Sequence, residues 1–344
     1  MGSSPKFKRF LFLSLFFLFL CLIGLLQIKE KAGLPFTLDS SGSKLVISNK
    51  NENSILKKGD IFLLIENHRF TSVEEIEVLL DGKKPGEQVT VKYKRSGVEL
   101  TAEISLVNYY STVDLITYFF SGILFLTIGF ITVVKSSHKK ESLLFYYGCS
   151  GAALLITMTS GSYVVFNEYL GYITRFIFHL AYSITPVIFV HFILNFPQEN
   201  KDGSPVIIKI LYSFAILLSI GLTLTFIAGV INDSTAQIKQ HIWIYDYVLR
   251  VFVIINFIGT VFLFIYSYKR IRSVPDRKKL KWILSGFVIG PLGYIVFWVF
   301  PYLVFGKGLL PEFLVIGLLS AVPITFALAI VKEPEFQSVS LPLR

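Results

Sequence analysis

Eight long apolar stretches, separated by short polar connections, constrain most strongly what this chain can fold into. Each stretch is about as long as the ~20 residues that an α-helix needs to cross a ~30 Å hydrocarbon core. The stretches are Phe10–Ile28, Val113–Val134, Leu143–Phe166, Tyr172–Phe196, Val206–Ile231, Tyr245–Tyr268, Trp282–Phe305 and Phe313–Val331. They predict a membrane all-α polytopic bundle of about eight transmembrane helices, with a soluble α+β domain inserted after the first helix.

The composition also favours a chain surrounded by lipid. Hydrophobic residues make up 53% of the 344 residues, so a soluble fold would leave a large apolar patch exposed. A net charge of +10 suggests nucleic acid in a soluble chain, but here the basic residues gather in loops beside apolar stretches. We therefore expect membrane lipid as the surroundings and no nucleic acid as a partner.

Positive charge alternates between the two sides of the predicted bundle. It is concentrated before the first stretch, between the second and third, around residues 201–209, after the eighth at Lys332, and above all in the run Lys269–Lys281. By the positive-inside rule both termini are cytoplasmic, and the basic run lies beside anionic inner-leaflet lipid. The predicted parts are a tail and uncleaved anchor (1–28), an extracytoplasmic domain (31–107), a seven-helix bundle (113–331) and a short cytoplasmic tail (332–344).

The inserted segment predicts a water-soluble fold. Its β-rich runs are Lys44–Ser48, Ile61–Ile65, Gln88–Tyr93 and Val98–Leu106, and the last two alternate across a turn at Ser96-Gly97. Between the second and third run, Ser72–Leu80 has apolar residues at helical spacing behind a capping-box pattern. The predicted order is strand, strand, helix, strand, strand.

These segments resemble a PDZ domain. In Leu56–Phe70, the pair Gly59-Asp60 directly precedes a central strand, as in the corresponding PDZ segment. Pro85–Val89 followed by Lys94–Gly97 is similar to the closing hairpin of that family. The resemblance implies a carboxylate-binding loop and a strand that accepts a peptide by β-augmentation. The groove residues that it implies are Leu34, Phe36, Thr37, Leu38 and Ile76.

Two departures leave an alternative open. Pro35 has no backbone N–H, so one donor of the implied carboxylate-binding loop is missing, and His68 stands where the family has a turn glycine. The segment could instead act as a structural lid or a dimer contact.

The bundle carries a second resemblance. Three segments are similar to the multi-pass input regions of bacterial sensor histidine kinases: His191–Pro197, Pro275–Gly286 and Ala321–Ile330. The layout of the whole chain resembles that of competence-pheromone sensor kinases. This resemblance implies sensing of an extracellular signal in a bacterial inner membrane. Residues 332–344 are too few for a catalytic domain, so we expect the output to come from a separate protein.

Enzymatic chemistry is not predicted. No His-Glu-x-x-His pattern of a membrane zinc protease occurs, and the serine-protease candidate, Ser160-Gly161-Ser162 with His179, has a spacing common by chance. Cys21 and Cys149 lie in apolar stretches, which indicates packing rather than a disulfide or metal site. We expect no catalytic residues, no metal and no cofactor.

Ionisable residues within the stretches gather near their outer ends. They are Asp114, Glu168, Arg175, His179, Asp246 and Arg250. Because charges in lipid are costly, such groups face a partner, a cavity or the headgroups, so these six either line a ligand pocket beneath the inserted domain or snorkel to the interface. Tyrosines and tryptophans near the same ends, among them Tyr109, Tyr110, Tyr245 and Trp298, are interpreted as interfacial anchors.

The expected function is an input protein that detects an extracytoplasmic peptide or small ligand and signals to a separate kinase, phosphatase or cyclase. A second copy of the chain, in a homodimer, is a further candidate partner. The alternatives are a PDZ-based scaffold or chaperone for extracytoplasmic proteins and, less favoured, a transporter, for which internal repeats and mid-membrane polar groups are not evident.

Overall fold

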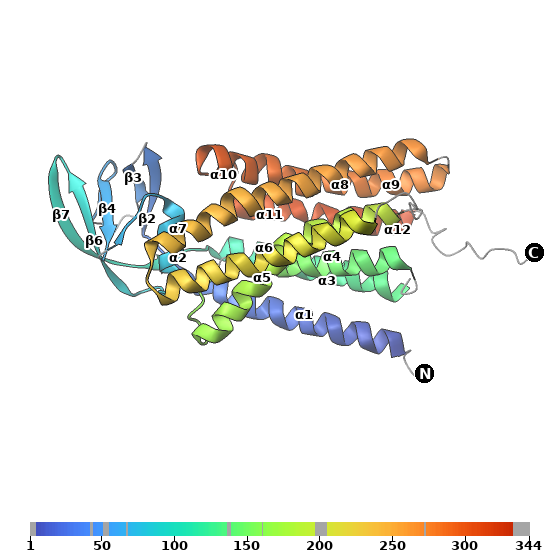
Figure 1. Cartoon of the computed structure of the whole chain (residues 1–344), viewed down its shortest axis with the longest axis horizontal. Helices are drawn as coiled ribbons and strands as arrows, with labels where there is room; N and C mark the ends of the chain where they lie inside the picture. Colours follow the sequence, from blue (N-terminus) through green and yellow to red (C-terminus); the bar gives the residue numbers. More distant parts are fainter. Residues whose placement is uncertain are drawn as a thin grey trace, which may run out of the picture.

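The computed structural model describes residues 5–41, 44–50, 55–66, 68–135, 139–159, 161–196, 205–271 and 273–332. An α/β module lies at one end of an elongated helix bundle (Figure 1). Helix α1 begins, and α12 ends, at the opposite end of the bundle, which we call the far end. The chain therefore runs once to the module and then passes back and forth along the bundle.

The bounds of the elements are as follows. The helices are α1 (Pro5–Lys29), α2 (Val73–Leu80), α3 (Thr112–Lys135), α4 (Lys140–Thr157), α5 (Glu168–Asn195), α6 (Pro205–Ile231), α7 (Thr235–Trp243), α8 (Arg250–Arg270), α9 (Val274–Phe287), α10 (Phe300–Phe305), α11 (Glu312–Leu319) and α12 (Ala321–Lys332), with π-helical segments η1 (Ile244–Leu249), η2 (Val288–Leu292) and η3 (Ile295–Val299). The strands are β1 (Ala32–Gly33), β2 (Phe36–Ser41), β3 (Lys44–Lys50), β4 (Ile61–Ile65), β5 (His68–Arg69), β6 (Gln88–Arg95), β7 (Val98–Ser105) and β8 (Val107–Asn108).

The module is built on an antiparallel sheet with the strand order β2-β3-β4-β6-β7, and β5 pairs with β4. Ser96 and Gly97 have φ values of 50° and 88°, the left-handed conformation that a tight hairpin turn between β6 and β7 requires. The Ser72 hydroxyl accepts a hydrogen bond from the Glu75 backbone N–H at 3.3 Å, as the capping pattern predicts. The four predicted strands and the helix occur in the predicted order, and the structure adds β2 before them and β5 before the helix.

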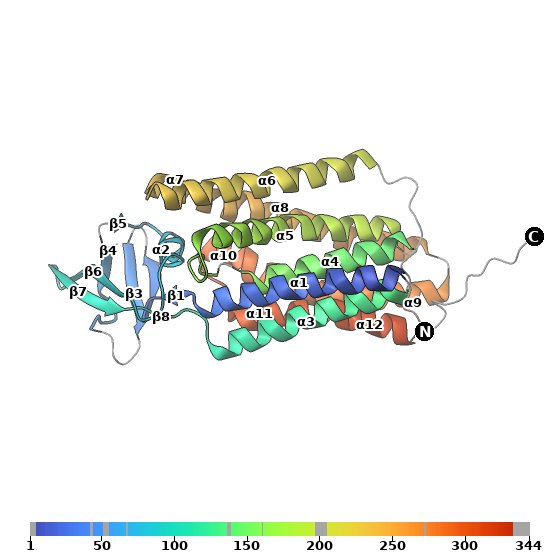
Figure 2. The same cartoon turned by 90° about the horizontal axis from the view of Figure 1, so that it is seen from below.

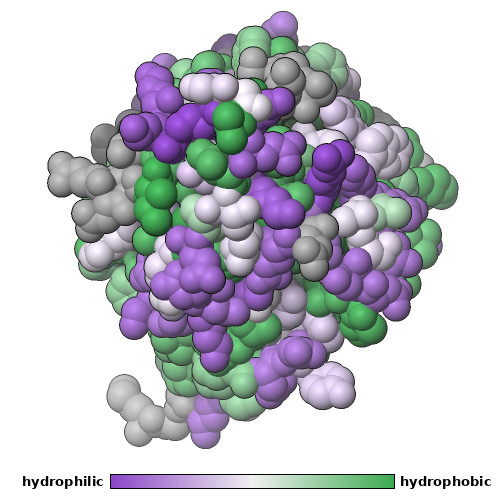
Figure 3. Space-filling view, turned by 90° about the vertical axis from the view of Figure 1, so that its left-hand side faces the viewer, coloured by the Kyte–Doolittle hydropathy of each residue, from purple (hydrophilic) through white to green (hydrophobic). Residues whose placement is uncertain are grey.

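Two further features close the module. The short pair β1–β8 joins its two ends, where the chain leaves α1 and enters α3. Seen from the module, the surface is largely hydrophilic with scattered apolar residues, as expected for a domain in water (Figure 3).

Seven helices of the described residues are long and apolar enough to cross a membrane, which indicates a multi-pass membrane protein. They are Pro5–Lys29, Thr112–Lys135, Glu168–Asn195, Pro205–Ile231, Thr235–Arg270, Asp276–Phe305 and Glu312–Ala329. The predicted count of about eight includes α4, which is not among these seven, and the predicted span Leu143–Phe166 is wrong as drawn, because α4 ends at Thr157.

The sequence around α4 explains why this helix is shorter than the predicted span. Its first turn contains Lys140 and Glu141, and the small polar residues that follow Thr157 favour a turn over further helix. Helix α4 nevertheless packs between α3 and α5 and beside α1 (Figure 2). Most of its side chains are buried. It brings the chain from the far end back to the module.

Small residues allow α1 and α3 to approach α4 closely. A Cβ atom on Gly24 would lie 2.6 Å from the Met158 side chain and would also clash with the Thr157 carbonyl. A Cβ atom on Gly122 would lie 2.6 Å from the Thr157 side chain. Close backbone approach at small residues is a usual source of helix packing in lipid.

One helix is longer than the sequence predicts. The segment from Thr235 to Arg270 is continuous through α7, η1 and α8, whereas the predicted span began at Tyr245. The additional turns of α7 reach past the bundle and contact α2 of the module. A single rod therefore connects the module to the far end.

Candidate functional site

The module meets the bundle through one acidic face of α2. Glu74, Glu77 and Asp81 are three and four residues apart and therefore share that face. Asp81 follows the last turn of α2 and is only 1% exposed. A buried carboxylate requires cationic or hydrogen-bonding partners, and here the bundle supplies them.

Asp81 is the centre of this contact. Its Oδ1 lies 3.1 Å from Lys31 Nζ, and its Oδ2 accepts a hydrogen bond from Arg175 Nη2 at 2.7 Å. The backbone carbonyl of Asp81 also accepts hydrogen bonds from the Ser162 hydroxyl at 3.0 Å and from the Tyr163 N–H at 3.2 Å. One residue thus ties the module to the end of α1, the turn after α4, and α5.

Glu77 lies beside this centre. It accepts a hydrogen bond from the Tyr109 hydroxyl at 3.0 Å, and Lys31 Nζ lies 3.9 Å from its other oxygen. Burial raises the pKa of Glu77 above its usual 4.5, and the positive charge of Lys31 opposes this shift.

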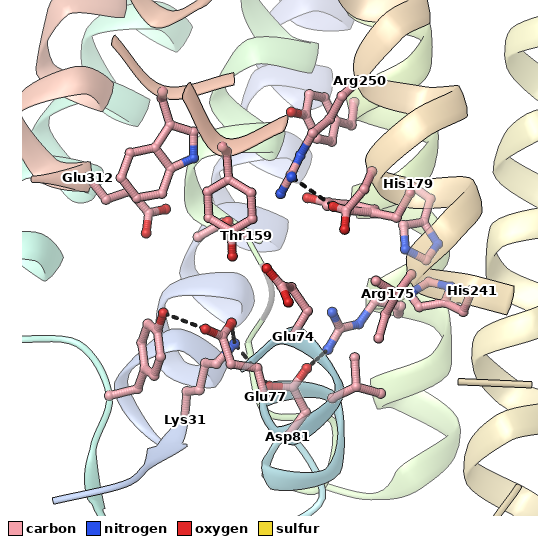
Figure 4. A pocket seen from close by; sticks show the side chains of 18 of the residues that line it. Lys31, Glu74, Glu77, Asp81, Thr159, Arg175, His179, His241, Arg250 and Glu312 are labelled. Carbon is pink, nitrogen blue, oxygen red and sulfur yellow. Dashed lines mark hydrogen bonds and ion pairs between the residues drawn. The ribbon is translucent and has the colours of Figure 1, made fainter. Parts of the chain in front are cut away.

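The acidic face and the bundle enclose a cavity of about 150 Å³, which we call the inner cavity (Figure 4). Its lining is unusually rich in charged and aromatic side chains. The lining residues are Lys31, Glu74, Glu77, Val78, Asp81, Tyr109, Tyr110, Thr159, Arg175, His179, Tyr182, His241, Ile242, Tyr245, Asp246, Arg250, Tyr294, Trp298, Tyr302 and Glu312.

Arg250 forms a second buried ion pair on the wall of the inner cavity. Its Nη1 lies 2.7 Å from Asp246 Oδ1, one helical turn earlier in η1. The guanidinium also lies over the Tyr302 and Tyr245 rings, at 4.2 and 5.2 Å from their centroids. Both cavity arginines are therefore neutralised by aspartates of this chain.

Two histidines stand next to each other on the same wall, with ring centroids 5.5 Å apart. His179 Nδ1 lies 2.9 Å from Thr223 Oγ1, and His241 Nδ1 lies 3.1 Å from the Leu222 carbonyl. Since a carbonyl can only accept, His241 carries its proton on Nδ1.

A larger groove of about 870 Å³ opens between β2, α2 and the bundle, and we call it the outer groove. Its lining residues are Leu38, Asp39, Thr71, Ser72, Val73, Glu74, Glu75, Lys239, Ile242, Trp243, Asp246, Tyr247, Arg250, Tyr302, Leu303, Val304, Phe305, Gly306 and Lys307. Five of these also line the inner cavity: Glu74, Ile242, Asp246, Arg250 and Tyr302. The two spaces therefore share a wall.

Four of the six polar residues predicted to share a pocket lie together in the inner cavity: Arg175, His179, Asp246 and Arg250. Asp114 and Glu168 do not line it, and their inclusion was wrong. Asp114 accepts hydrogen bonds from Ser111 at the start of α3, while Glu168 is exposed in the first turn of α5. Both act at helix N-termini, where carboxylates are stabilising.

The five groove residues implied by the PDZ resemblance lie in different parts of the module. Leu38 lines the outer groove, but Phe36 and Ile76 are buried in the core of the module, and Leu34 packs against that core. The Thr37 hydroxyl lies 2.9 Å from Ser48 Oγ on β3. Only Leu38 of the five lines the outer groove, and a β-bulge between Thr37 and Leu38 interrupts the alternation that would otherwise turn Phe36 and Leu38 to the same face.

Sequence reasoning missed the acids of α2 and Lys31. The spacing of Glu74, Glu77 and Asp81 marks a helical face, but nothing in the sequence shows what that face contacts. It also interpreted Tyr109, Tyr110, Tyr245 and Trp298 as interfacial anchors, whereas they line the inner cavity.

Ser162 and the two cysteines, considered for catalysis or metal binding, do not line the inner cavity or the outer groove. Ser162 is buried and donates to the Asp81 carbonyl, while Ser160 lies outside the described residues. Within the described ranges, no group of three or more His, Cys, Asp or Glu side chains is placed to hold a metal ion. Cys21 and Cys149 are free and buried.

The long apolar helices indicate a multi-pass membrane protein with an α+β domain after its first helix. Residues 38–106 match the sequence model of the PDZ domain, so the module is a PDZ domain. No curated protein and no solved structure gives a significant match to the chain.

Proposed function

We propose that this protein is a membrane sensor that takes up an extracytoplasmic ligand between its PDZ domain and its helix bundle. The observation that carries the proposal is the orientation of the domain. Its edge strand β2 and helix α2, between which PDZ domains accept peptides, face the bundle across the outer groove. A ligand in this groove would touch both parts at once.

Such a ligand can shift a conformational equilibrium only by binding one state better than another. Contact with both walls supplies that difference, because any change in how α2 docks changes the site. The rod α7–η1–α8 carries groove residues Lys239, Trp243 and Arg250 near one end and reaches Arg270 at the far end. We propose that it transmits the change to a separate kinase, phosphatase or cyclase near the basic segment Lys269–Lys281.

The walls of the groove also favour a sensor over a scaffold. A scaffold for folded extracytoplasmic proteins needs a groove that is open to a large partner, but α7, η1 and α10 form the opposite wall here. The space suits a short peptide or a small ligand.

The proposed orientation places the PDZ domain outside and the far end in the cytoplasm. Its support is the charge distribution: α3 ends at Lys135, α4 begins at Lys140 and the basic segment follows α8, all at the far end. Ser96→Cys in the domain should react with a membrane-impermeant thiol reagent in intact cells, whereas Ser273→Cys should not. Labelling of Ser273→Cys alone would reverse the orientation.

Ligand uptake is tested by thermal unfolding of the purified protein in detergent with a panel of short peptides that have free apolar C-termini. We expect at least one peptide to raise the Tm. Leu38→Asp, in the outer groove, should abolish the shift, and Val98→Asp, on the exposed opposite edge strand β7, should preserve it. A shift that survives Leu38→Asp, or no shift with any peptide, would contradict uptake in this groove.

A further inference from the structure

The charges around the inner cavity do not balance. Three basic side chains line it, and each has an acidic partner: Lys31 and Arg175 share Asp81, with Glu77 beside Lys31, and Arg250 pairs with Asp246. Two acids of the lining remain, Glu74 and Glu312. Among the described residues, no ion pair within 4.0 Å joins either of them to a basic group. The cavity therefore has an excess of negative charge.

A second, independent observation is a buried hydrogen-bond acceptor on the wall of the inner cavity. His179 is fully buried, lines the inner cavity, and its Nε2 has no partner among the described residues. The Thr223 hydroxyl donates to the Ser219 carbonyl at 2.8 Å, so it can only accept from His179 Nδ1 at 2.9 Å. The proton of His179 is therefore on Nδ1, and Nε2 offers a lone pair.

The remaining walls suit a cation. Tyr109, Tyr182, Tyr245, Tyr302 and Trp298 present aromatic groups to the cavity, and ring faces attract cations more strongly when water is excluded. Arg250 already lies over two of these rings, which shows that they accept a positive charge in this geometry. The volume of the inner cavity, about 150 Å³, matches that of cavities known to hold a benzene-sized group.

We propose that the inner cavity binds a compact organic ammonium group at the carboxylate of Glu74, with the Glu312 carboxylate on one wall and the hydrogen-bond acceptor His179 Nε2 on the opposite wall. The inference deepens the proposed function, on which it rests, by naming the chemistry of the ligand. Since the outer groove shares Glu74, Asp246 and Tyr302 with the inner cavity, a ligand lying in the groove can place its amine in the cavity.

An anionic ligand is disfavoured by the same geometry. Arg175 and Arg250, the groups that would bind it, already contact aspartates at 2.7 Å. An anion would have to displace a carboxylate that is itself buried, and the displaced carboxylate would lose its partner.

The test uses butylammonium, butanol and butyrate, which have similar size but carry positive, zero and negative charge. Thermal unfolding of the full chain in detergent is followed at constant ionic strength. We expect butylammonium alone to raise the Tm in a saturable way, with an affinity in the low-millimolar range that suits so small a ligand. Equal shifts from butyrate and butylammonium, or no shift from butylammonium, would overturn the proposal.

Variants locate the site. Glu312→Gln and His179→Phe should each weaken the butylammonium response at least tenfold, and Glu99→Gln on exposed β7 should leave it unchanged. If His179→Phe does not fold, Glu74→Gln at the half-exposed wall replaces it. Full retention of the response in the Glu312→Gln and Glu74→Gln variants would place the amine elsewhere and contradict the proposal.

The outcome is separable from that of the peptide experiment. Leu38→Asp blocks the outer groove but should leave the butylammonium shift intact, because Leu38 does not line the inner cavity. A peptide shift without an amine shift would reject the ammonium site and keep the sensor. A Tm shift with butylammonium but with no peptide would keep the ammonium site and reject peptide uptake in the outer groove.

Discussion

The two sides of the PDZ domain use the same residue types in opposite ways. On the α2 side, Asp81 is buried and its partners Lys31 and Arg175 come from outside the domain. On the sheet side, Lys83 pairs with Glu66 and Glu87 within the domain, where all three side chains are partly exposed. Within the domain, the buried Asp60 pairs with the partly exposed Arg95, whereas Asp81 takes both of its basic partners from outside the domain. Loss of the Asp81 charge should therefore weaken docking to the bundle, whereas loss of an exposed charge such as that of Glu87 should not.

The largest expected effect is that of Asp81→Asn. This change leaves Lys31 and Arg175 without their shared carboxylate in a buried site, and losing one partner of a buried ion pair costs about 3–5 kcal/mol. We expect a clear fall in Tm and faster proteolysis of the linkers on either side of the domain. The matched control is Glu87→Gln, which should cost less than about 1 kcal/mol because its pair with Lys83 is partly exposed. Equal effects would remove the distinction between the two sides.

Packing beneath the domain should matter next. Gly24→Leu places a side chain against Thr157 and Met158 where α1 meets α4, and such overpacking typically costs about 1–3 kcal/mol. Gly221→Leu is the control, because no atom lies within 4 Å of a Cβ at that position of α6. Thermal unfolding should show a lower Tm for the first variant only. A tolerated Gly24→Leu would contradict the close α1–α4 contact.

The pH dependence should differ in sign between the two sides. Hydrogen bonds from Arg95, at 2.8 and 2.7 Å, lower the pKa of Asp60, so its stabilising contribution is present above its usual 3.8 and is lost as the pH falls through the lowered value. Burial raises the pKa of Glu77, so its contribution is complete below its usual 4.5 and is lost as the pH rises through the raised value.

Unfolding of the two variants across a pH series checks this contrast. Relative to the parent protein, Asp60→Asn should lose its destabilisation toward acid pH. Glu77→Gln should gain in relative stability as the pH rises above about 4.5. Parallel curves for both variants and the parent would show that neither carboxyl is shifted as described.

The smallest effect is expected where the domain and the bundle touch through exposed charges. Lys307 Nζ and Asp39 Oδ1 are 3.9 Å apart, with side chains 71% and 52% exposed. Lys307→Gln should change the free energy of unfolding by less than about 0.5 kcal/mol, within the range of exposed pairs. A larger loss would mean that the Lys307–Asp39 pair at the rim of the outer groove stabilises docking of the domain, which we expect to depend on Asp81 instead.

The sequence predicts elements whose signals are local. The Gly59-Asp60 pair, the Ser96-Gly97 turn and the cap at Ser72 each depend on neighbouring residues, and the PDZ domain follows from them. Contacts between distant segments carry no such signal. Asp81 and Arg175 are far apart in the chain, and only the folded bundle shows that the acids of α2 neutralise its cations. Tyr109, Tyr110 and Tyr245 were interpreted as interfacial anchors for the same reason, since an aromatic ring at a helix end suits a membrane interface as well as a cavity wall.

Cross-linking in membranes tests most directly whether the PDZ domain rests on the bundle with its groove facing inward. Asp39→Cys and Lys307→Cys, combined in a background with Cys21 and Cys149 replaced by Ala, place two thiols at the rim of the outer groove. A short bismaleimide should join them rapidly within one chain, whereas the pair Glu99→Cys and Lys307→Cys should react slowly because Glu99 lies on β7, at the opposite edge of the sheet. Equal rates for the two pairs would contradict the docked arrangement and, with it, the site between domain and bundle.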